Sequence, residues 1–136
     1  MANALYPLWV AGLLQGSSNM TLNGTVKAAL IDTNDVSYSA AHDFYNDISA
    51  GVVGTPQTLG SKTYTGGVFD AADVTFTGLT GDQLEAIVIY IDTGNPATSP
   101  LVAWIDTGIT NSPLTPTGAD VTIVWNASGI FEIKLP

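Results

Sequence analysis

The feature that most limits the fold of this chain is a series of short segments rich in Val, Ile, Thr and aromatic residues after Val52. Such residues favour strands, and the segments are bounded by Gly, Pro, Asn or Asp, which favour turns. The predicted strands are residues 25–31, 52–55, 62–65, 73–77, 84–92, 101–106, 121–125 and 130–135. Short strands at this spacing predict a mainly β fold, either an antiparallel β-sandwich or a barrel-like domain.

Two of these segments also predict how the strands are buried. Apolar and polar residues alternate in Val74-Thr75-Phe76-Thr77, so one face of that strand should meet solvent. Residues 86–91 read Ala-Ile-Val-Ile-Tyr-Ile without alternation. We therefore expect this strand to be central in its sheet and buried on both faces.

Helical spacing occurs in two places. Residues 3–15 fit a short helix with Pro7 in its first turn and Gly16 after its end. Residues 40–48 fit a second short helix that begins after Ser39. The first helix could pack on the domain's own core or insert into a neighbouring protein, and both interpretations stay open. Its candidate partner-binding residues are Leu5, Leu8, Trp9 and Leu13.

The length of 136 residues and the 46% apolar content fit one domain with its own core, spanning residues 1–136. Within it, residues 1–15 form a candidate helical arm or anchor, and residues 25–136 form a β-rich body. The apolar stretch 5–14 is far shorter than the ~20 residues that cross a bilayer.

Charge is scarce and one-sided. Only 11% of residues are charged, against about 25% in typical domains, and the net charge is −9. Three lysines and no arginine cannot supply the cationic surface that nucleic acids or anionic membranes need, so we predict neither partner. A surface with so few charges is either coated with Thr, Ser, Asn and Gly or covered by neighbouring proteins.

No arrangement of residues predicts catalysis. Asp-Thr-Gly follows an apolar strand at residues 92–94 and again at 106–108, as in aspartic proteases. The two copies are too close in the chain to come from separate lobes, and a turn explains them. His42 is the only histidine, and the chain has no cysteine. We predict a non-enzymatic protein with no catalytic residues and no cofactor.

Residues that could bind a metal ion or a sugar have simpler structural explanations. Asp70 and Asp73 are weak candidates for Ca²⁺, with further oxygen ligands from Asp32, Asp35, Asp92 or Asp106 if these lie nearby in space. No stretch has the alternating acidic loop of a calcium site, so no metal is expected. Trp9, Trp104 and Trp125 could form a sugar-binding platform, but the last two lie inside apolar strands, where packing in the core is expected.

Several segments taken together resemble a family of short virion structural proteins of tailed bacteriophages. The similarity covers nearly the whole chain, in this order: residues 1–7 (MANALYP), 13–16 (LLQG), 26–33 (VKAALIDT), 38–44 (YSAAHDF), 67–76 (GVFDAADVTF), 89–94 (IYIDTG) and 124–131 (VWNASGIF). Such proteins look like capsid cement or decoration subunits, or less often small tail components.

This resemblance implies a protein that binds the assembled shell and stabilises it. Its implied partner is the major capsid protein, with a homo-oligomer left open, and its implied place is the capsid surface of the virion after synthesis in the host cytoplasm. The alternatives are a small phage tail component and a carbohydrate-binding β-sandwich module. Exposure of the tryptophans distinguishes the last of these, because sugar binding needs a ring in an open groove.

Overall fold

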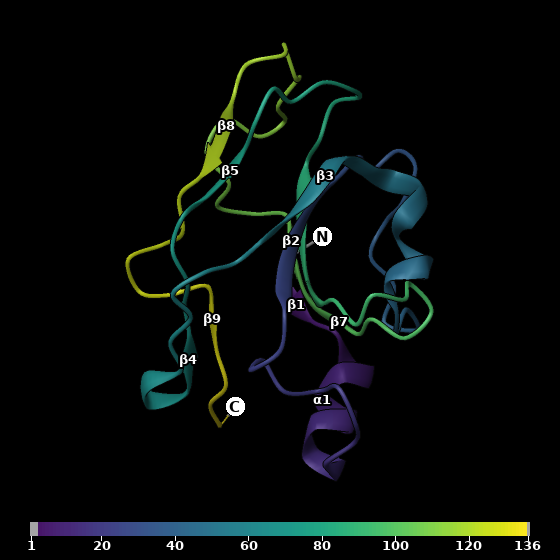
Figure 1. Cartoon of the computed structure of the whole chain (residues 1–136), viewed down its shortest axis with the longest axis vertical. Helices are drawn as coiled ribbons and strands as arrows, with labels where there is room; N and C mark the ends of the chain where they lie inside the picture. Colours follow the sequence, from purple (N-terminus) through teal and green to yellow (C-terminus); the bar gives the residue numbers. More distant parts are fainter. Residues whose placement is uncertain (1–2, 136) are drawn as a thin grey trace.

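A five-stranded antiparallel sheet is the largest element of the computed structural model, which describes residues 3–135 (Figure 1). The strand order is β1-β7-β6-β2-β3, and every neighbouring pair is antiparallel. The bounds are β1 Ala4–Leu5, β2 Val26–Ile31, β3 Val52–Thr58, β6 Ala86–Ile91 and β7 Leu101–Ile105. The mainly β, antiparallel prediction is confirmed.

Two short ladders form a second layer beside this sheet. One pairs β4 (Val68–Phe69) with β9 (Phe131–Glu132), and the other pairs β5 (Val74–Phe76) with β8 (Val121–Ile123). Figure 1 shows both ladders on the same side of the five-stranded sheet. The arrangement is sandwich-like, and the strands between residues 3 and 135 close no barrel.

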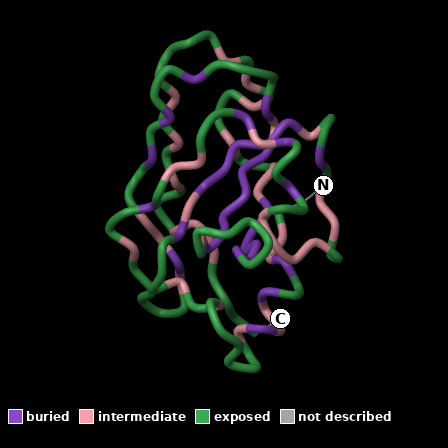
Figure 2. The backbone as a smooth tube through the Cα atoms, turned by 45° about the vertical axis from the view of Figure 1, so that its right-hand side comes forward, coloured by how far each residue is buried: buried purple, intermediate pink, exposed green. Residues whose placement is uncertain are grey.

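Both burial predictions are confirmed. All six residues of β6 are buried, because β2 and β7 flank this strand and both of its faces are covered. In β5 the two apolar residues are buried and Thr75 between them is exposed. Figure 2 shows the buried backbone running through the middle of the molecule.

The face of the sheet that carries Tyr90 and Trp104 is covered by the segment 36–51. Tyr45 packs on Tyr90 with 4.6 Å between ring centroids, and Tyr38 packs edgewise on Trp104 at 6.1 Å. Alternate residues of a strand point to opposite faces, so Ile87 and Ile89 face the second layer.

Helix α1 (Pro7–Gln15) is shorter than the predicted 3–15, because the residues before Pro7 pair with β7 as strand β1. Proline suits the first helical position, where its missing N–H has no partner to lose. The helix ends at Gly16, whose φ of 71° is left-handed. Trp9 is 2% exposed and its Nε1 donates to Met20 O at 2.8 Å. The helix therefore packs on the domain's own core.

The predicted second helix over 40–48 is wrong. Two 3₁₀ turns, Tyr45–Asp47 and Ser49–Gly51, replace it. Tertiary pairing takes the backbone groups that a helix would need: Phe44 bridges Pro100, and the Tyr45 N–H donates to Ser99 O at 2.9 Å.

The predicted strand over 62–65 is also wrong. Thr63 forms a single bridge with Asp70, and a 3₁₀ turn at Thr65–Gly67 follows directly. Gly66 and Gly67 have φ of 66° and 79°, and this left-handed backbone ends any extended run.

Candidate partner-binding surfaces

The four residues predicted to bind a partner do not form one exposed stripe. Trp9 is buried in the core, while Leu5 and Leu13 are half-buried and pack against it. Leu8 is 45% exposed. Leu14 on the same helix is 83% exposed, although it was not among the four. The helix has more apolar residues than a normal amphipathic helix, and this excess is the sequence signal that could have identified Leu14.

Four exposed apolar side chains lie on α1 and on the residues that follow β9. Trp9 and Phe131 join α1 to β9, with 5.9 Å between their ring centroids. Figure 1 shows α1 and the C-terminal end of the chain in the same lower part of the molecule. We call these four residues the apolar end: Leu8 and Leu14 on α1, and Ile133 and Leu135 after β9.

The C-terminal members of the apolar end come after β9 and are well exposed. Leu135 is 91% exposed and Ile133 is 51% exposed. Large apolar side chains with this much exposed surface are candidates for contact with another protein. Trp9 is buried and its ring contacts that of Phe131, which links α1 to β9.

All three lysines have partners within the chain. Lys27 Nζ pairs with Asp92 Oδ2 at 2.8 Å, and Lys134 Nζ pairs with Glu132 Oε1 at 3.1 Å. Lys62 Nζ donates to the carbonyl oxygens of Leu22 and Gly24. Few cationic groups are therefore left to attract an acidic partner.

Carboxyl groups with shifted pKa values lie in turns and ion pairs rather than in a catalytic cleft. The hydrogen bond from Lys27, followed by the one from the Gly94 N–H, lowers the pKa of Asp92 below its usual 3.8. The Asp43 N–H, together with that of Phe44, lowers the pKa of Asp47. Burial raises the pKa of Asp43, and its hydrogen bond to Asp47 adds to this. Hydrogen bonds, an ion pair and burial are therefore sufficient to explain these pKa shifts.

The second Asp-Thr-Gly copy also forms a structural contact. Asp106 Oδ2 accepts from Trp104 Nε1 at 2.9 Å, and the Asp106 N–H donates to Asn3 Oδ1 at 2.8 Å. The first copy is a turn in which the Gly94 N–H donates to Asp92 Oδ1 at 2.9 Å. His42 lies in a turn after Ser39 rather than on a helix.

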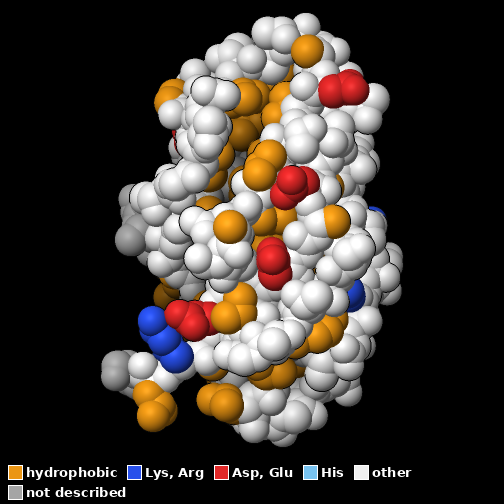
Figure 3. Space-filling model, turned by 90° about the vertical axis from the view of Figure 1, so that its left-hand side faces the viewer, with side chains coloured by type: hydrophobic (Ala, Val, Ile, Leu, Met, Phe, Trp, Pro, Cys, Tyr) orange, Lys and Arg blue, Asp and Glu red, His pale blue; other side chains and the backbone are white. Residues whose placement is uncertain are grey.

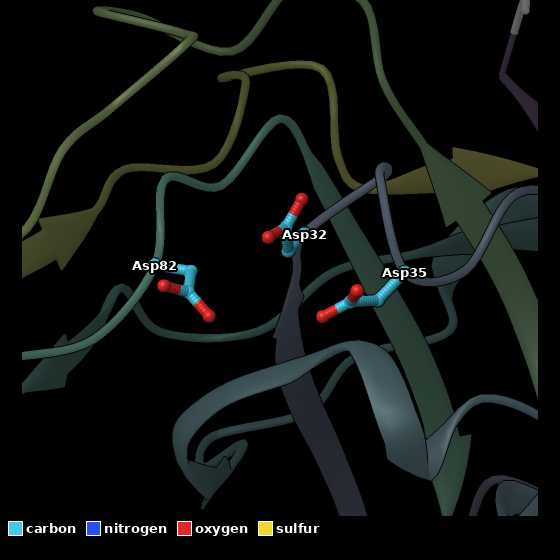
Figure 4. Close-up of side chains that lie close together, drawn as sticks. All are labelled: Asp32, Asp35 and Asp82. Carbon is cyan, nitrogen blue, oxygen red and sulfur yellow. The ribbon is translucent and has the colours of Figure 1, made fainter.

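Three carboxylates do converge, but they are not the predicted pair. Asp32, Asp35 and Asp82 place carboxylate oxygens within 4.8 Å of one another (Figure 4). Asp32 is buried and its Oδ1 accepts from the Asn34 N–H at 2.8 Å, while the other two are exposed. Carboxylate oxygens suit Ca²⁺, which takes six to eight oxygen ligands, so three side chains supply at most part of such a shell.

Asp70 and Asp73 lie apart from this cluster and have backbone partners. Asp70 Oδ1 accepts from the Ala71 N–H at 2.9 Å, and Asp73 Oδ1 accepts from the Trp125 N–H at 3.0 Å. Both contacts fix turns or strand ends. The sequence analysis named Asp32 and Asp35 only as possible neighbours of Asp70 and Asp73, and it missed Asp82, which comes from a loop far along the chain.

The tryptophans do not form one platform. Trp104 is 1% exposed, as expected for a core residue, and Trp9 is also buried. Trp125 is half-buried, and its Nε1 donates to Ala72 O at 3.1 Å. It lies on the wall of a hollow of about 790 Å³ between β7 and β8. At most one of the three rings could therefore meet a sugar.

No protein-family model matches this chain, and no curated protein matches it either. Over the described residues 3–135, no helix has the length and apolar character needed to cross a membrane.

Proposed function

We propose that this protein is a non-enzymatic structural protein of a tailed-phage virion, a cement or decoration subunit that binds the assembled shell and stabilises it. Its partner is the major capsid protein. The observation that carries this proposal is the apolar end, in which Leu8, Leu14 and Leu135 are exposed. The resemblance of the sequence to virion structural proteins supports the same class.

The exposed leucines could contribute to binding by becoming buried. Burying one leucine side chain completely contributes roughly 1.5–3 kcal/mol before the costs of association. Leu14 and Leu135 are 83% and 91% exposed, so most of that contribution is still to be gained on binding. Leu8 adds to it on the helix.

The charges support an interface that depends little on ion pairs. Lys27, Lys62 and Lys134 are engaged within the chain. Exposed ion pairs contribute only about 0–1 kcal/mol each and weaken as salt screens them. We therefore expect binding to shells to persist at high salt.

Co-sedimentation with shells that lack the protein tests this proposal. The double variant Leu8→Glu/Leu14→Glu places charges on exposed positions of α1, and we expect at least a tenfold loss of binding. The matched control Thr55→Glu/Thr58→Glu adds the same charges on exposed positions of β3 and should bind like the wild type. Circular dichroism should show that both variants keep the fold. Wild-type occupancy by the α1 variant would overturn the proposed anchor.

A further inference from the structure

The hollow between the two layers has an apolar floor. It occupies about 790 Å³ between β7 and the residues after it on one side and β8 and the residues after it on the other. Ile87, Ile105, Ile123 and Ile130 contribute to its lining. Figure 3 shows apolar side chains at the bottom of a depression on the side of the molecule that carries the two short ladders.

One wall of the hollow is a strand edge. Among the described residues, β8 pairs only with β5, and β9 pairs only with β4. Residues 120–126, which include all of β8, line the hollow without a break. A strand with one unpaired edge can accept a further extended chain through its backbone N–H and C=O groups.

The single charged side chain among the residues that line the hollow is acidic. Asp120 lines it next to the start of β8, and Asp73 holds the backbone of Trp125 after the end of β8. None of the three lysines lines it. Figure 3 shows acidic side chains beside the apolar depression. An occupant would therefore need an apolar centre with cationic groups near its ends.

We propose that this hollow receives an extended apolar segment with Lys or Arg at both flanks, supplied by a partner protein and added beside β8. The segment's apolar side chains meet Ile87 and Ile123, and its flanking cations lie near Asp120 and Asp73. This surface is distinct from the apolar end, so the inference goes beyond the shell anchor and does not depend on it.

Two capped peptides test the proposal with the full-length protein. The probe is the sequence Lys-Thr-Val-Thr-Val-Thr-Val-Lys, and the matched control has Glu at both ends instead of Lys. At low salt we expect saturable binding of the probe, with amide shifts in the NMR spectrum concentrated in residues 105–130. We expect the control to bind at least tenfold more weakly and this ratio to shrink as salt is added.

A conservative substitution assigns the charge effect to the hollow. Asp120→Asn keeps an oxygen that can accept from the Gly78 N–H and removes one charge, so it should weaken probe binding about threefold. Asp43→Asn, in the segment that covers the opposite face of the sheet, should leave binding unchanged. Absence of saturable binding up to millimolar peptide overturns the proposal. Amide shifts outside the hollow, or equal affinity for the two peptides, also overturn it.

Discussion

The two faces of the five-stranded sheet are covered to different degrees. On one face, Tyr38 and Tyr45 from the segment 36–51 pack directly on Trp104 and Tyr90. On the other face, two ladders of two strands each leave a hollow of about 790 Å³ over Ile87 and its neighbours. The same central strands support both faces, so the difference comes from the covering layers.

The two faces should therefore contribute differently to stability and to binding. A closely packed face loses contacts with any change of volume, whereas a face beside a hollow has room to adjust. Exposed apolar side chains and unpaired strand edges lie with the ladders and α1, where a partner could cover them. We therefore expect substitutions on the closed face to affect folding and those on the open side to affect binding.

The largest effect is expected on the closed face. Trp104→Ala removes a ring that is 1% exposed and leaves the Asp106 carboxylate without its Nε1 donor, so it should cost about 3–5 kcal/mol of unfolding free energy. Trp125→Ala beside the hollow should cost about 1–2 kcal/mol. Denaturant unfolding measures both. Equal losses would contradict the contrast between the faces.

The two sides of α1 should differ in the same way. Trp9→Phe loses the hydrogen bond to Met20 O and part of the packing, so we expect a loss of about 1–2 kcal/mol. Leu14→Ala changes an exposed side chain and should alter stability by less than about 0.5 kcal/mol. Thermal unfolding of both variants gives the comparison. A larger loss for Leu14→Ala would show that this leucine belongs to the core.

The Lys27–Asp92 pair predicts a pH dependence. Lys27 lowers the pKa of Asp92 below 3.8, so the ionised carboxylate stabilises the fold at neutral pH. This contribution is lost as pH falls below about 4 through the folded-state pKa. Lys27→Met should therefore cost about 0.5–1 kcal/mol at pH 7, and the cost should shrink toward pH 2. Urea unfolding across this range measures it, and a cost that is independent of pH would refute the assignment.

The smallest effect is expected at the Asp32, Asp35 and Asp82 cluster. Three carboxylates within 4.8 Å repel one another, so Asp82→Asn should raise Tm by about 1 °C in EDTA. Asp120→Asn is the matched control and should give no such gain. A lower Tm for Asp82→Asn would mean that this carboxylate makes a stabilising contact.

Strands were predictable where the pattern of apolar and polar residues within the strand reflects its burial. The unbroken apolar run in β6 and the alternation in β5 each reflect burial of that strand alone. The turns at 45–51 were not predictable in this way, because Phe44 pairs with Pro100 and that partner lies far along the chain. Tertiary pairing therefore overrode the helical spacing of residues 40–48.

The candidate surfaces were predictable only in part. The spacing of Leu5, Trp9 and Leu13 indicates a helix, but contacts of Trp9 with Met20 and Phe131 decide which side is buried. The hollow and the acidic cluster depend on how separate loops meet. Loop geometry of this kind has no periodic pattern in the sequence.

The location of the protein in purified phage particles tests directly whether it is a subunit on the capsid surface. Heads and tails are separated, and the protein is quantified in each by mass spectrometry and located in a map of the intact particle. We expect many copies on the outer surface of heads, in fixed proportion to the major capsid protein. Copies confined to tails, or no copies in the particle, would contradict it.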